Sequence, residues 1–356
     1  MGGEEPGDSH LARVRALILR YGWNSTAYQI LNPGIAHWFS SDGEAVVGYV
    51  ERGSVRVVAG APVCEAERLP EIAANFEVSS ADGGASVCYF GAEERLESLY
   101  RDSSTHSRVL LGAQPAWKPE DWPEIVAGHS SLRAQLNRAA NKGVVVSEWP
   151  ASRAAEDSGL QRCLDEWLST RGLPPLHFLV EPETLARLFD RRIFVGEQDA
   201  VPVGFLVASP IPRRNGWLIE QFVRGHGAPN GTIELMIDTA LHAMIDSGSS
   251  YVTLGLSPLS PHAPVEAPLN PAWLKLILGW VRAHGRRFYN FEGLDAFKRK
   301  FQPQRWEPIY AISNESHFSP RSLYAIAAAF SDRSVASTVG RALVGAVKQE
   351  AMWKLG

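Results

Sequence analysis

The sequence predicts a mixed α/β (α+β) protein built from two halves and a helical tail. Its 356 residues exceed the usual size of a single hydrophobic core, so two domains are expected. Runs with strand alternation and runs with helical periodicity follow one another in both halves, which is typical of an α+β order. The last part of the chain has helical periodicity alone. We therefore expect domains over residues 1–150 and 151–318 and an amphipathic tail over residues 319–356.

The first half begins with a helical pattern over residues 11–20. Three short alternating runs then predict strands at 37–40, 45–50 and 54–59, with Gly43 and Gly53 at the turns between them. A helix over 69–76, a strand over 86–90 and a helix over 93–100 follow. In the segment SLRAQLNRAANKG, Leu132, Leu136 and Ala140 share one helical face, which predicts an amphipathic helix.

The second half begins after a polar stretch at residues 148–157, where we place the domain boundary. Strands are expected at 192–196, 203–208, 217–223 and 251–256, and a further helix at 273–283. Two sets of apolar residues at helical spacing predict two more helices: Leu160, Cys163, Leu164, Trp167 and Leu168, and then Ile233, Met236, Ile237, Ala240, Leu241 and Met244.

The composition favours a folded chain outside the membrane. Hydrophobic residues make up 45% and charged residues 21%, an ordinary globular balance. The longest apolar run, residues 323–330, is far shorter than the roughly 20 residues that a membrane span requires. The N-terminus has neither the basic start nor the apolar segment of a secretion signal, so the cytoplasm is the expected location. The three cysteines lack metal-ligand spacing and are expected in the core.

Charge is distributed unevenly along the chain. The net charge of −4 gives no overall attraction for nucleic acid, so such binding would need a local basic patch. Residues 280–310 provide one, with seven basic side chains against three acidic ones. The tail is also basic on its polar face, so it either lies in a membrane interface or packs against the domain.

The most informative unit is WLIEQFVRGHGAPNGTIELMIDTALHAM, which is typical of a strand, a glycine-containing loop and a helix. Gly225, Gly227 and Gly231 allow a tight turn, and the free N–H groups at a helix start carry a partial positive charge. Such a loop either holds an anion or is a plain turn, since the GK[ST] of a P-loop is missing.

GAPNG with its following helix, then LGLSPLS, then RFYNFEGLDAFKRKFQPQRWEPIYA resemble the C-terminal catalytic domain of phosphatidylglycerol lysyltransferases. The resemblance extends upstream through FSSDGEAVVGYV, LRAQLNRAANKG and DEWLSTRG, so it covers about residues 21–312. It implies two tandem acetyltransferase-like (GNAT-like) domains. It also implies an aminoacyltransferase that moves an amino acid from aminoacyl-tRNA to a lipid hydroxyl, most simply that of phosphatidylglycerol, without a metal or coenzyme A as cofactor.

The N-terminal transmembrane flippase region that usually accompanies this family has no counterpart in the sequence. The resemblance therefore implies a freestanding synthase that meets an anionic phospholipid as a peripheral protein on the inner face of the cytoplasmic membrane.

Aminoacyl transfer requires placement of the lipid hydroxyl, removal of its proton and stabilisation of an oxyanion. A carboxylate on the strand before the loop would suit the role of base, and Glu220 is the candidate, with Arg224 four residues further on. The alternative is a salt bridge at the strand end. The family strand carries an Asp three residues before the Arg, where this chain has Gln221.

Four further residues are candidates for substrate binding, two in the glycine-containing loop and two on the amphipathic helix of SLRAQLNRAANKG. Asn230 and Gly231 match the family motif as donors at the helix start, although Asn–Gly pairs also favour plain turns. Arg138 and Lys142 share one helical face and would contact the tRNA backbone. The alternative for this face is a solvated charged surface.

The resemblance suggests that FYNFEG and FKRKF bind the lipid phosphate or the tRNA terminus. This places Tyr289, Asn290, Lys298 and Lys300 in the site, with Lys298 as the preferred phosphate partner. A solvated basic helix is the alternative. The histidines show neither ligand spacing nor triad order, so we assign them no role.

Two other functions remain open at this stage. The glycine loop also fits an acyl-CoA-dependent N-acyltransferase of the acetyltransferase class, and the fold also suits a non-catalytic binding module. The sequence does not distinguish alanine from lysine as the amino acid, nor phosphatidylglycerol from another hydroxylated lipid.

Overall fold

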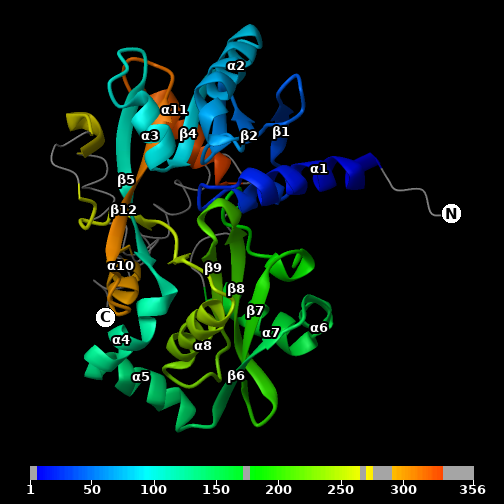
Figure 1. Ribbon diagram of the computed structural model, residues 1–356, viewed down its shortest axis with the longest axis vertical. Coiled ribbons are helices and arrows are strands. Elements are labelled where there is room, and N and C mark those ends of the chain that lie inside the picture. Colours follow the sequence, from blue (N-terminus) through cyan, green and yellow to red (C-terminus); the bar gives the residue numbers. More distant parts are fainter. Residues whose placement is uncertain (1–5, 171–176, 265–269, 276–290, 332–356) are drawn as a thin grey trace, which may run out of the picture.

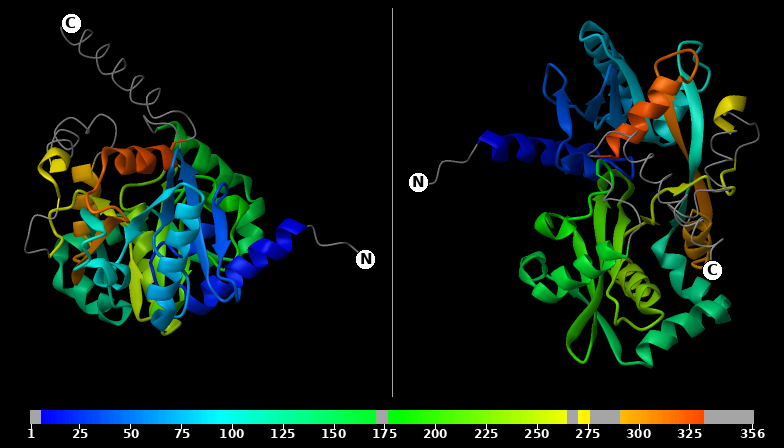
Figure 2. Two further views of the ribbon diagram at one scale, coloured as in Figure 1. Left: turned by 90° about the horizontal axis from the view of Figure 1, so that it is seen from above. Right: turned by 180° about the vertical axis from the view of Figure 1, so that it is seen from behind.

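A single twisted sheet with helices on both faces runs through both halves of the molecule (Figures 1 and 2). The computed structural model describes residues 6–170, 177–264, 270–275 and 291–331. Within these ranges the strands are β1 (Ala36–Phe39), β2 (Val46–Arg52), β3 (Val55–Ala59), β4 (Ser86–Ala92), β5 (Ser107–Trp117), β6 (Val144–Trp149), β7 (Arg192–Gln198), β8 (Val201–Ile211), β9 (Gly216–Arg224), β10 (Tyr251–Thr253), β11 (Ser257–Pro258) and β12 (Arg305–Ser313).

The described helices include those predicted near residues 11–20, 69–76, 93–100, 132–140, 160–168 and 233–244, and two short ones, at 122–128 and 151–156, that were not predicted. The described helices are α1 (Pro6–Tyr21), α2 (Leu69–Asp82), α3 (Glu94–Tyr100), α4 (Trp122–Gly128), α5 (Ser130–Ala140), α6 (Ala151–Glu156), α7 (Ser158–Ser169), α8 (Thr232–Asp246), α10 (Phe291–Arg299) and α11 (Pro320–Ala329). The part of the chain that the structure describes also contains five short 3₁₀ turns: η1 (Tyr28–Leu31), η2 (Ala66–Arg68), η3 (Pro119–Asp121), η4 (Thr184–Ala186) and η5 (Pro212–Arg214).

The strand order is β1-β2-β3-β4-β12-β5-β10-β9-β8-β7-β6, with β11 paired to β5. Only two of the described pairs are parallel, β3 with β4 and β9 with β10, and each of these pairs is joined through a helix, α2 or α8. Each half thus contains antiparallel strands followed by one strand–helix–strand unit. This repeated order confirms the predicted mixed α/β fold of two tandem acetyltransferase-like halves.

The halves exchange segments across the predicted boundary. β12, from late in the chain, lies between β4 and β5 of the first half, and α11 packs on β2 and β3 (Figure 1). Conversely, β6 pairs with β7, and α5 packs on α8 in the second half. The boundary at residue 150 therefore stays a prediction, since one sheet joins the halves. Of the predicted tail, residues 320–329 form α11, and the part after residue 331 lies outside the described residues.

Among the described residues, five apolar clusters pack against this sheet. In the second half, the predicted stripe of α8 is buried with Met236, Ile237 and Leu241 against Phe194 of β7 and Leu206 of β8. The opposite face of these strands is covered by α6 and α7. Each such large apolar side chain contributes roughly 1.5–3 kcal/mol when it is fully buried, so this packing holds α8 firmly against β7 and β8.

Some local predictions differ from the structure. Ala139 rather than Ala140 faces the core on α5. The sequence pattern does not predict β5, because Gly112 and Pro115 interrupt its apolar alternation. β10 ends at Thr253, earlier than expected. Most of the helix predicted at 273–283 and all of the basic tail face lie outside the described residues.

The three cysteines are buried, as predicted. Burial raises the pKa of the Cys64 thiol to about 12 and that of the Cys163 thiol to about 11. These thiols are therefore protonated and unreactive near neutral pH. None of the described helices combines the length and hydropathy that a bilayer crossing requires.

Candidate functional site

The two parallel strands of the second half separate soon after they pair. β9 and β10 are in register only from Gly216–Tyr251 to Leu218–Thr253. Beyond Leu218, β9 continues to Arg224 with β8 as its strand partner on one side. Among the described strands none pairs with the other edge of this stretch.

The loop after β9 turns sharply into α8. Gly231 has φ of +96°, and a Cβ at this position would lie 2.4 Å from the Gln135 carbonyl oxygen on α5, so only glycine fits. Arg224 donates to the Ala228 carbonyl at 2.8 Å and to Asn230 Oδ1 at 3.1 Å. The structure thus brings Arg224, Asn230 and Gly231 together in one loop. Whether this loop holds an anion stays a prediction.

Glu220 is engaged in a buried ion pair. Its carboxylate accepts from Arg191 Nε at 2.5 Å and from Gln29 Nε2 at 2.8 Å. Burial acts to lower the pKa of Arg191, but the adjacent Glu220 carboxylate holds that pKa above its ordinary value. The salt bridge that we considered as the alternative is therefore present. This ion pair lies within β9 rather than at its end, and it links β9 to Arg191, the residue before β7. The hydrogen bond from Gln29 links β9 to η1.

Gln221 occupies the position where the family pattern has an Asp. Its side chain accepts from the Thr184 hydroxyl and donates to the Pro182 carbonyl at 3.0 Å. Glu220 and Gln221 therefore both contact the segment between residues 182 and 191, because Glu220 is an extra residue in β9, opposite Val207 and Ala208 of β8, and this bulge breaks the regular alternation of β9.

Lys298 is buried rather than exposed to solvent. Its Nζ donates to the Gly255 and Leu256 carbonyls at 2.8 and 2.9 Å, and the residue is 3% exposed. Burial lowers the pKa of Lys298 to about 7, although the nearby Asp295 carboxylate acts to raise it. A neutral amine still has two N–H donors, one for each carbonyl. We therefore revise its proposed role from a phosphate contact to positioning of the backbone that follows β10.

Three of the predicted basic residues, Arg138, Lys142 and Lys300, are exposed on a surface formed by α5 and the end of α10. Lys300 pairs with Glu234 in the first turn of α8 at 3.0 Å and reaches Gln135 of α5 at 3.5 Å. Arg138 lies one turn beyond Gln135, and Lys142 follows at the end of the helix, both exposed. Figure 1 shows α5, α8 and α10 close together at this end of the molecule. The other two candidates, Tyr289 and Asn290, lie outside the described residues.

His262 has surroundings that sequence spacing did not reveal. His262 Nε2 lies 3.2 Å from Asp295 Oδ2, and its ring stacks on Trp306 at 4.7 Å between centroids. The two acid–base groups are far apart in the chain, so no local motif signals the pair. Among the described residues no group of three or more His, Cys, Asp and Glu side chains is placed to hold a metal ion.

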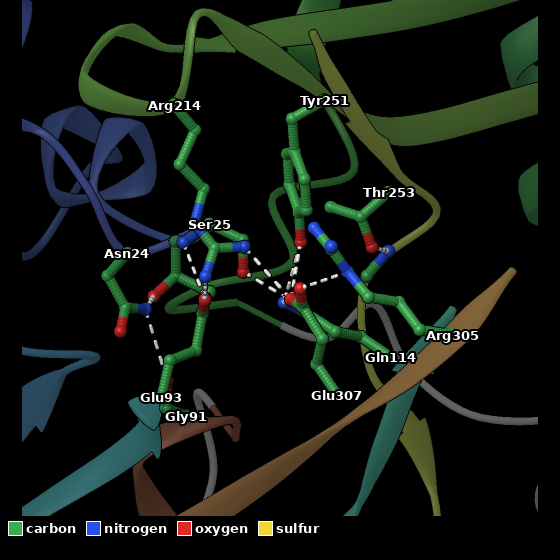
Figure 3. A network of polar contacts seen from close by, with 12 residues as sticks. Asn24, Ser25, Gly91, Glu93, Gln114, Arg214, Tyr251, Thr253, Arg305 and Glu307 are labelled. Atoms are coloured by element: carbon green, nitrogen blue, oxygen red, sulfur yellow. Dashed lines mark hydrogen bonds and ion pairs between the residues drawn. The ribbon is translucent and has the colours of Figure 1, made fainter. Parts of the chain in front are cut away.

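A buried polar network joins the two halves beneath this region, as Figure 3 shows. Arg214 of η5 reaches between Glu93 of the first half at 3.1 Å and Glu307 of β12 at 2.9 Å. Tyr251 at the start of β10 donates to Glu307 at 2.7 Å, and Gln114 of β5 donates to both. The network therefore fixes the start of β10 against the first half.

Burial and pairing act differently on the two carboxyl groups of this network. Burial raises the pKa of Glu93 more than Arg214 lowers it. For Glu307, burial is outweighed by Arg214 and by the Tyr251 and Gln114 hydrogen bonds, so its pKa lies below the ordinary value. Glu307 is thus held ionised, and the network carries at least one firmly charged pair.

A cavity of about 190 Å³ is lined in part by Arg191, the ion-pair partner of Glu220. None of the predicted site residues lines this cavity. Its walls come from the residues after η1 and from residues 181–191. Sequence reasoning missed it because its lining combines segments about 150 residues apart along the chain, so no local motif marks it.

These features define a tandem acetyltransferase-like protein whose candidate site lies where β9 and β10 separate. The family model described as phosphatidylglycerol lysyltransferase, C-terminal, matches residues 15–313. The chain belongs to this family, as the sequence motifs indicated.

Relatives and solved structures agree with this assignment. The chain is 24% identical over 302 residues to the phosphatidylglycerol lysyltransferase of Bacillus subtilis, with 84% of this chain and 34% of that protein aligned. It is 25% identical over 319 residues to the lysylphosphatidylglycerol biosynthesis bifunctional protein LysX of Mycolicibacterium vanbaalenii, with 86% and 28% aligned. The chain thus spans about a third of the length of these relatives.

Two solved structures share the fold at a TM-score of 0.75. One is L-PGS from Bacillus licheniformis, 20% identical, with 92% of this chain and 97% of that chain covered. The other is the C-terminal domain (DUF2156) of a putative lysylphosphatidylglycerol synthetase from Agrobacterium fabrum, 21% identical, with 90% and 95% covered. FemX has the same general fold at a TM-score of 0.54 and 9% identity, covering 92% and 99%.

Proposed function

We propose that this chain transfers an amino acid from aminoacyl-tRNA to the hydroxyl of a membrane lipid, most simply phosphatidylglycerol. The observation that carries this proposal is the family match over residues 15–313, which includes both halves and the whole β9–α8 unit. The names of the curated relatives supply the lipid and the type of reaction. The protein would meet the lipid from the inner face of the cytoplasmic membrane.

The reaction needs an activated ester but no covalent enzyme intermediate. A bond forms between the lipid oxygen and the carbonyl carbon of the amino acid, while the ester bond to the tRNA ribose breaks. The proton of the lipid hydroxyl ends on the ribose oxygen. The protein therefore has to orient the two reactants, relay one proton and stabilise a transient oxyanion.

Glu220 is the proposed proton acceptor, and Arg191 the proposed donor to the oxyanion. Arg191 has five N–H groups, of which three are used by Glu220 and by the Arg187 carbonyl. A guanidinium held by an adjacent carboxylate is preorganised, so it needs little rearrangement as negative charge develops. Arg224 and Asn230 shape the loop that follows β9, and Lys298 positions the backbone after β10.

The tRNA would lie over the surface formed by α5 and α10. Arg138, Lys142 and Lys300 are exposed there and suit phosphate contacts along a backbone. Tyr289 and Asn290 are proposed contacts to the lipid phosphate or the tRNA terminus, on the family motif alone. Such charge contacts give an affinity that falls steeply with salt.

The proposal is tested by incubating the full chain with radiolabelled aminoacyl-tRNAs and phosphatidylglycerol vesicles. A labelled lipid should form, and prior treatment of the charged tRNA with RNase should abolish it. Glu220→Gln keeps the shape of the side chain but cannot accept the proton, so it should lower the rate, by about 10²–10⁴-fold for a general base. If no charged tRNA gives a product with any bacterial lipid extract, the proposal is wrong.

An acyl-CoA-dependent N-acyltransferase is the second candidate, favoured by the strand–loop–helix geometry of β9 and α8. Titration calorimetry with coenzyme A separates the two. Micromolar binding that protects residues 225–231 from hydrogen exchange would support the second candidate. Unchanged cellular lipids after Glu220→Gln would favour a non-catalytic binding module.

A further inference from the structure

We propose that His10 of α1 and His37 of β1 together chelate a divalent transition-metal ion, of the class of Cu²⁺ or Zn²⁺, and so join the helix to the strand. The two histidines are 27 residues apart in the chain, so no local spacing marks them as ligands. Neither belongs to the candidate site or lines the 190 Å³ cavity, so the metal site is independent of the proposed function.

The two ring nitrogens already have the separation that one metal ion requires. His10 Nε2 lies 3.1 Å from His37 Nδ1. Two imidazole nitrogens that bind one ion at about 2.0–2.1 Å, with about 90–110° between the bonds, lie roughly 2.8–3.4 Å apart. An ion between these nitrogens therefore needs a small rotation of the imidazole rings but no shift of the backbone.

The protonation of His37 suits a metal ligand. Its Nε2 lies 2.8 Å from the Ile30 carbonyl oxygen, which can only accept, so Nε2 carries the proton and Nδ1 has a free lone pair. Metal-binding histidines commonly donate their other N–H to a carbonyl in this way. Burial lowers the pKa of His37, although the Ile30 hydrogen bond acts to raise it, so the ring is neutral at neutral pH.

His10 can supply the second lone pair without a net loss of a proton. In the metal-free protein its Nε2 donates to His37 Nδ1, since His37 Nδ1 has no proton to give. A neutral imidazole carries one proton on either nitrogen, and His10 is exposed, so water can move that proton to Nδ1. The metal ion then takes the place of the shared proton between the two rings.

The fold holds both ligands in place. The helix α1 is anchored by three buried side chains, those of Val14, Leu17 and Ile18. The ring of Phe39 meets the His10 ring edge-on, with 5.4 Å between centroids and 88° between planes. Because the ligands come from separate elements, the unfolded chain does not present them together, and metal binding favours the folded state.

The surroundings select a metal that prefers nitrogen. Arg13, one turn after His10, donates to the Gly43 carbonyl at 3.2 Å and lies over the Phe39 ring at 4.5 Å. This positive charge disfavours a cation that is attracted by charge alone. Imidazole nitrogens suit Cu²⁺, Ni²⁺ and Zn²⁺, whereas Mg²⁺ and Ca²⁺ require oxygen ligands, so these two ions should not bind. Water would complete the coordination on the exposed side.

The first test is titration calorimetry of the unaltered, tag-free full chain after removal of metal with EDTA and dialysis. Cu²⁺ should bind one to one and more tightly than Zn²⁺, and Mg²⁺ should not bind. Electron paramagnetic resonance of the Cu²⁺ complex should show coupling to two imidazole nitrogens. The absence of saturable Cu²⁺ binding, or a spectrum with fewer than two nitrogens, would overturn the proposal, and neither measurement needs a variant to fold.

Variants locate the ion. His10→Gln changes an exposed helical residue, so the fold should persist, and it removes one of the two ligands. Cu²⁺ binding should weaken at least tenfold, because affinity falls about 10–100-fold even when a group that only orients a ligand is lost. His242→Gln is the matched control, since His242 is an exposed helical histidine 3.6 Å from Asp238, and it should leave binding unchanged. Equal weakening in both variants, or unchanged binding in His10→Gln, would refute the site.

Thermal unfolding provides an independent measurement. An ion that binds only the folded chain stabilises it by mass action, so Zn²⁺ should raise the Tm of the unaltered chain. The rise should be smaller in His10→Gln and unchanged in His242→Gln. A rise of the same size in the unaltered chain and in His10→Gln would contradict a metal ion shared by α1 and β1.

Discussion

Replacing Arg214 by methionine should destabilise the protein more than any other single change in the network between the halves. The guanidinium is 11% exposed and pairs with both Glu93 and Glu307. Glu93 is 2% exposed, so in Arg214→Met its carboxylate loses its cation with almost no access to water. Breaking a buried ion pair from one side costs about 3–5 kcal/mol. This is a large share of the roughly 5–15 kcal/mol that stabilises a typical protein.

Urea unfolding followed by tryptophan fluorescence measures this cost by linear extrapolation. Arg305→Met is the matched control, since Arg305 pairs with the same Glu307 but is 53% exposed, and exposed pairs contribute at most about 1 kcal/mol. Adding Glu93→Gln to Arg214→Met should recover part of the loss, because the uncompensated charge is removed. The reasoning is refuted if Arg214→Met costs less than about 1 kcal/mol or no more than Arg305→Met.

Three further predictions concern the candidate site. Because the pKa of Lys298 is lowered to about 7 from 10.5, the unfolded chain binds a proton between these values that the folded chain does not. The free energy of unfolding should therefore rise with pH in this window by up to about 1.4 kcal/mol per unit relative to Lys298→Met, and a pH-independent difference in urea titrations would contradict this. Gly231→Ala should cost about 1–3 kcal/mol in thermal unfolding because of its positive φ and the adjacent α5 carbonyl, whereas Gly227→Ala, with open space around it, should cost far less. Replacing Arg138 and Lys142 by glutamine should reduce the salt slope of charged-tRNA binding, measured by fluorescence anisotropy, by about two; an unchanged slope would exclude this surface.

Much of the fold could be predicted from sequence because its signals are local. The apolar stripe of α8 and the alternation of β7 to β9 depend on neighbouring residues, and their elements lie where the pattern indicated. The pairing of strands is not local. Nothing in the pattern of residues 305–313 indicates that this strand hydrogen-bonds to both β4 and β5, because strand order depends on contacts across the whole chain.

The candidate site could be predicted only in part, for the same reason. Arg224 and Asn230 are six residues apart, so a loop motif was enough to bring them together. The partners of Glu220, Arg191 and Gln29, lie 29 and 191 residues away from it. Residue type alone also did not show that Lys298 is buried, since a basic helix normally faces solvent.

The position of β12 also governs how the protein can be made. β12 pairs with both β4 and β5. During synthesis, the edges of β4 and β5 that face each other therefore stay unpaired until residue 313 has left the ribosome. Exposed edges of this kind invite pairing with other chains. Cutting the gene at the midpoint therefore does not yield two self-sufficient pieces: the front piece acquires its missing strand only from the back one.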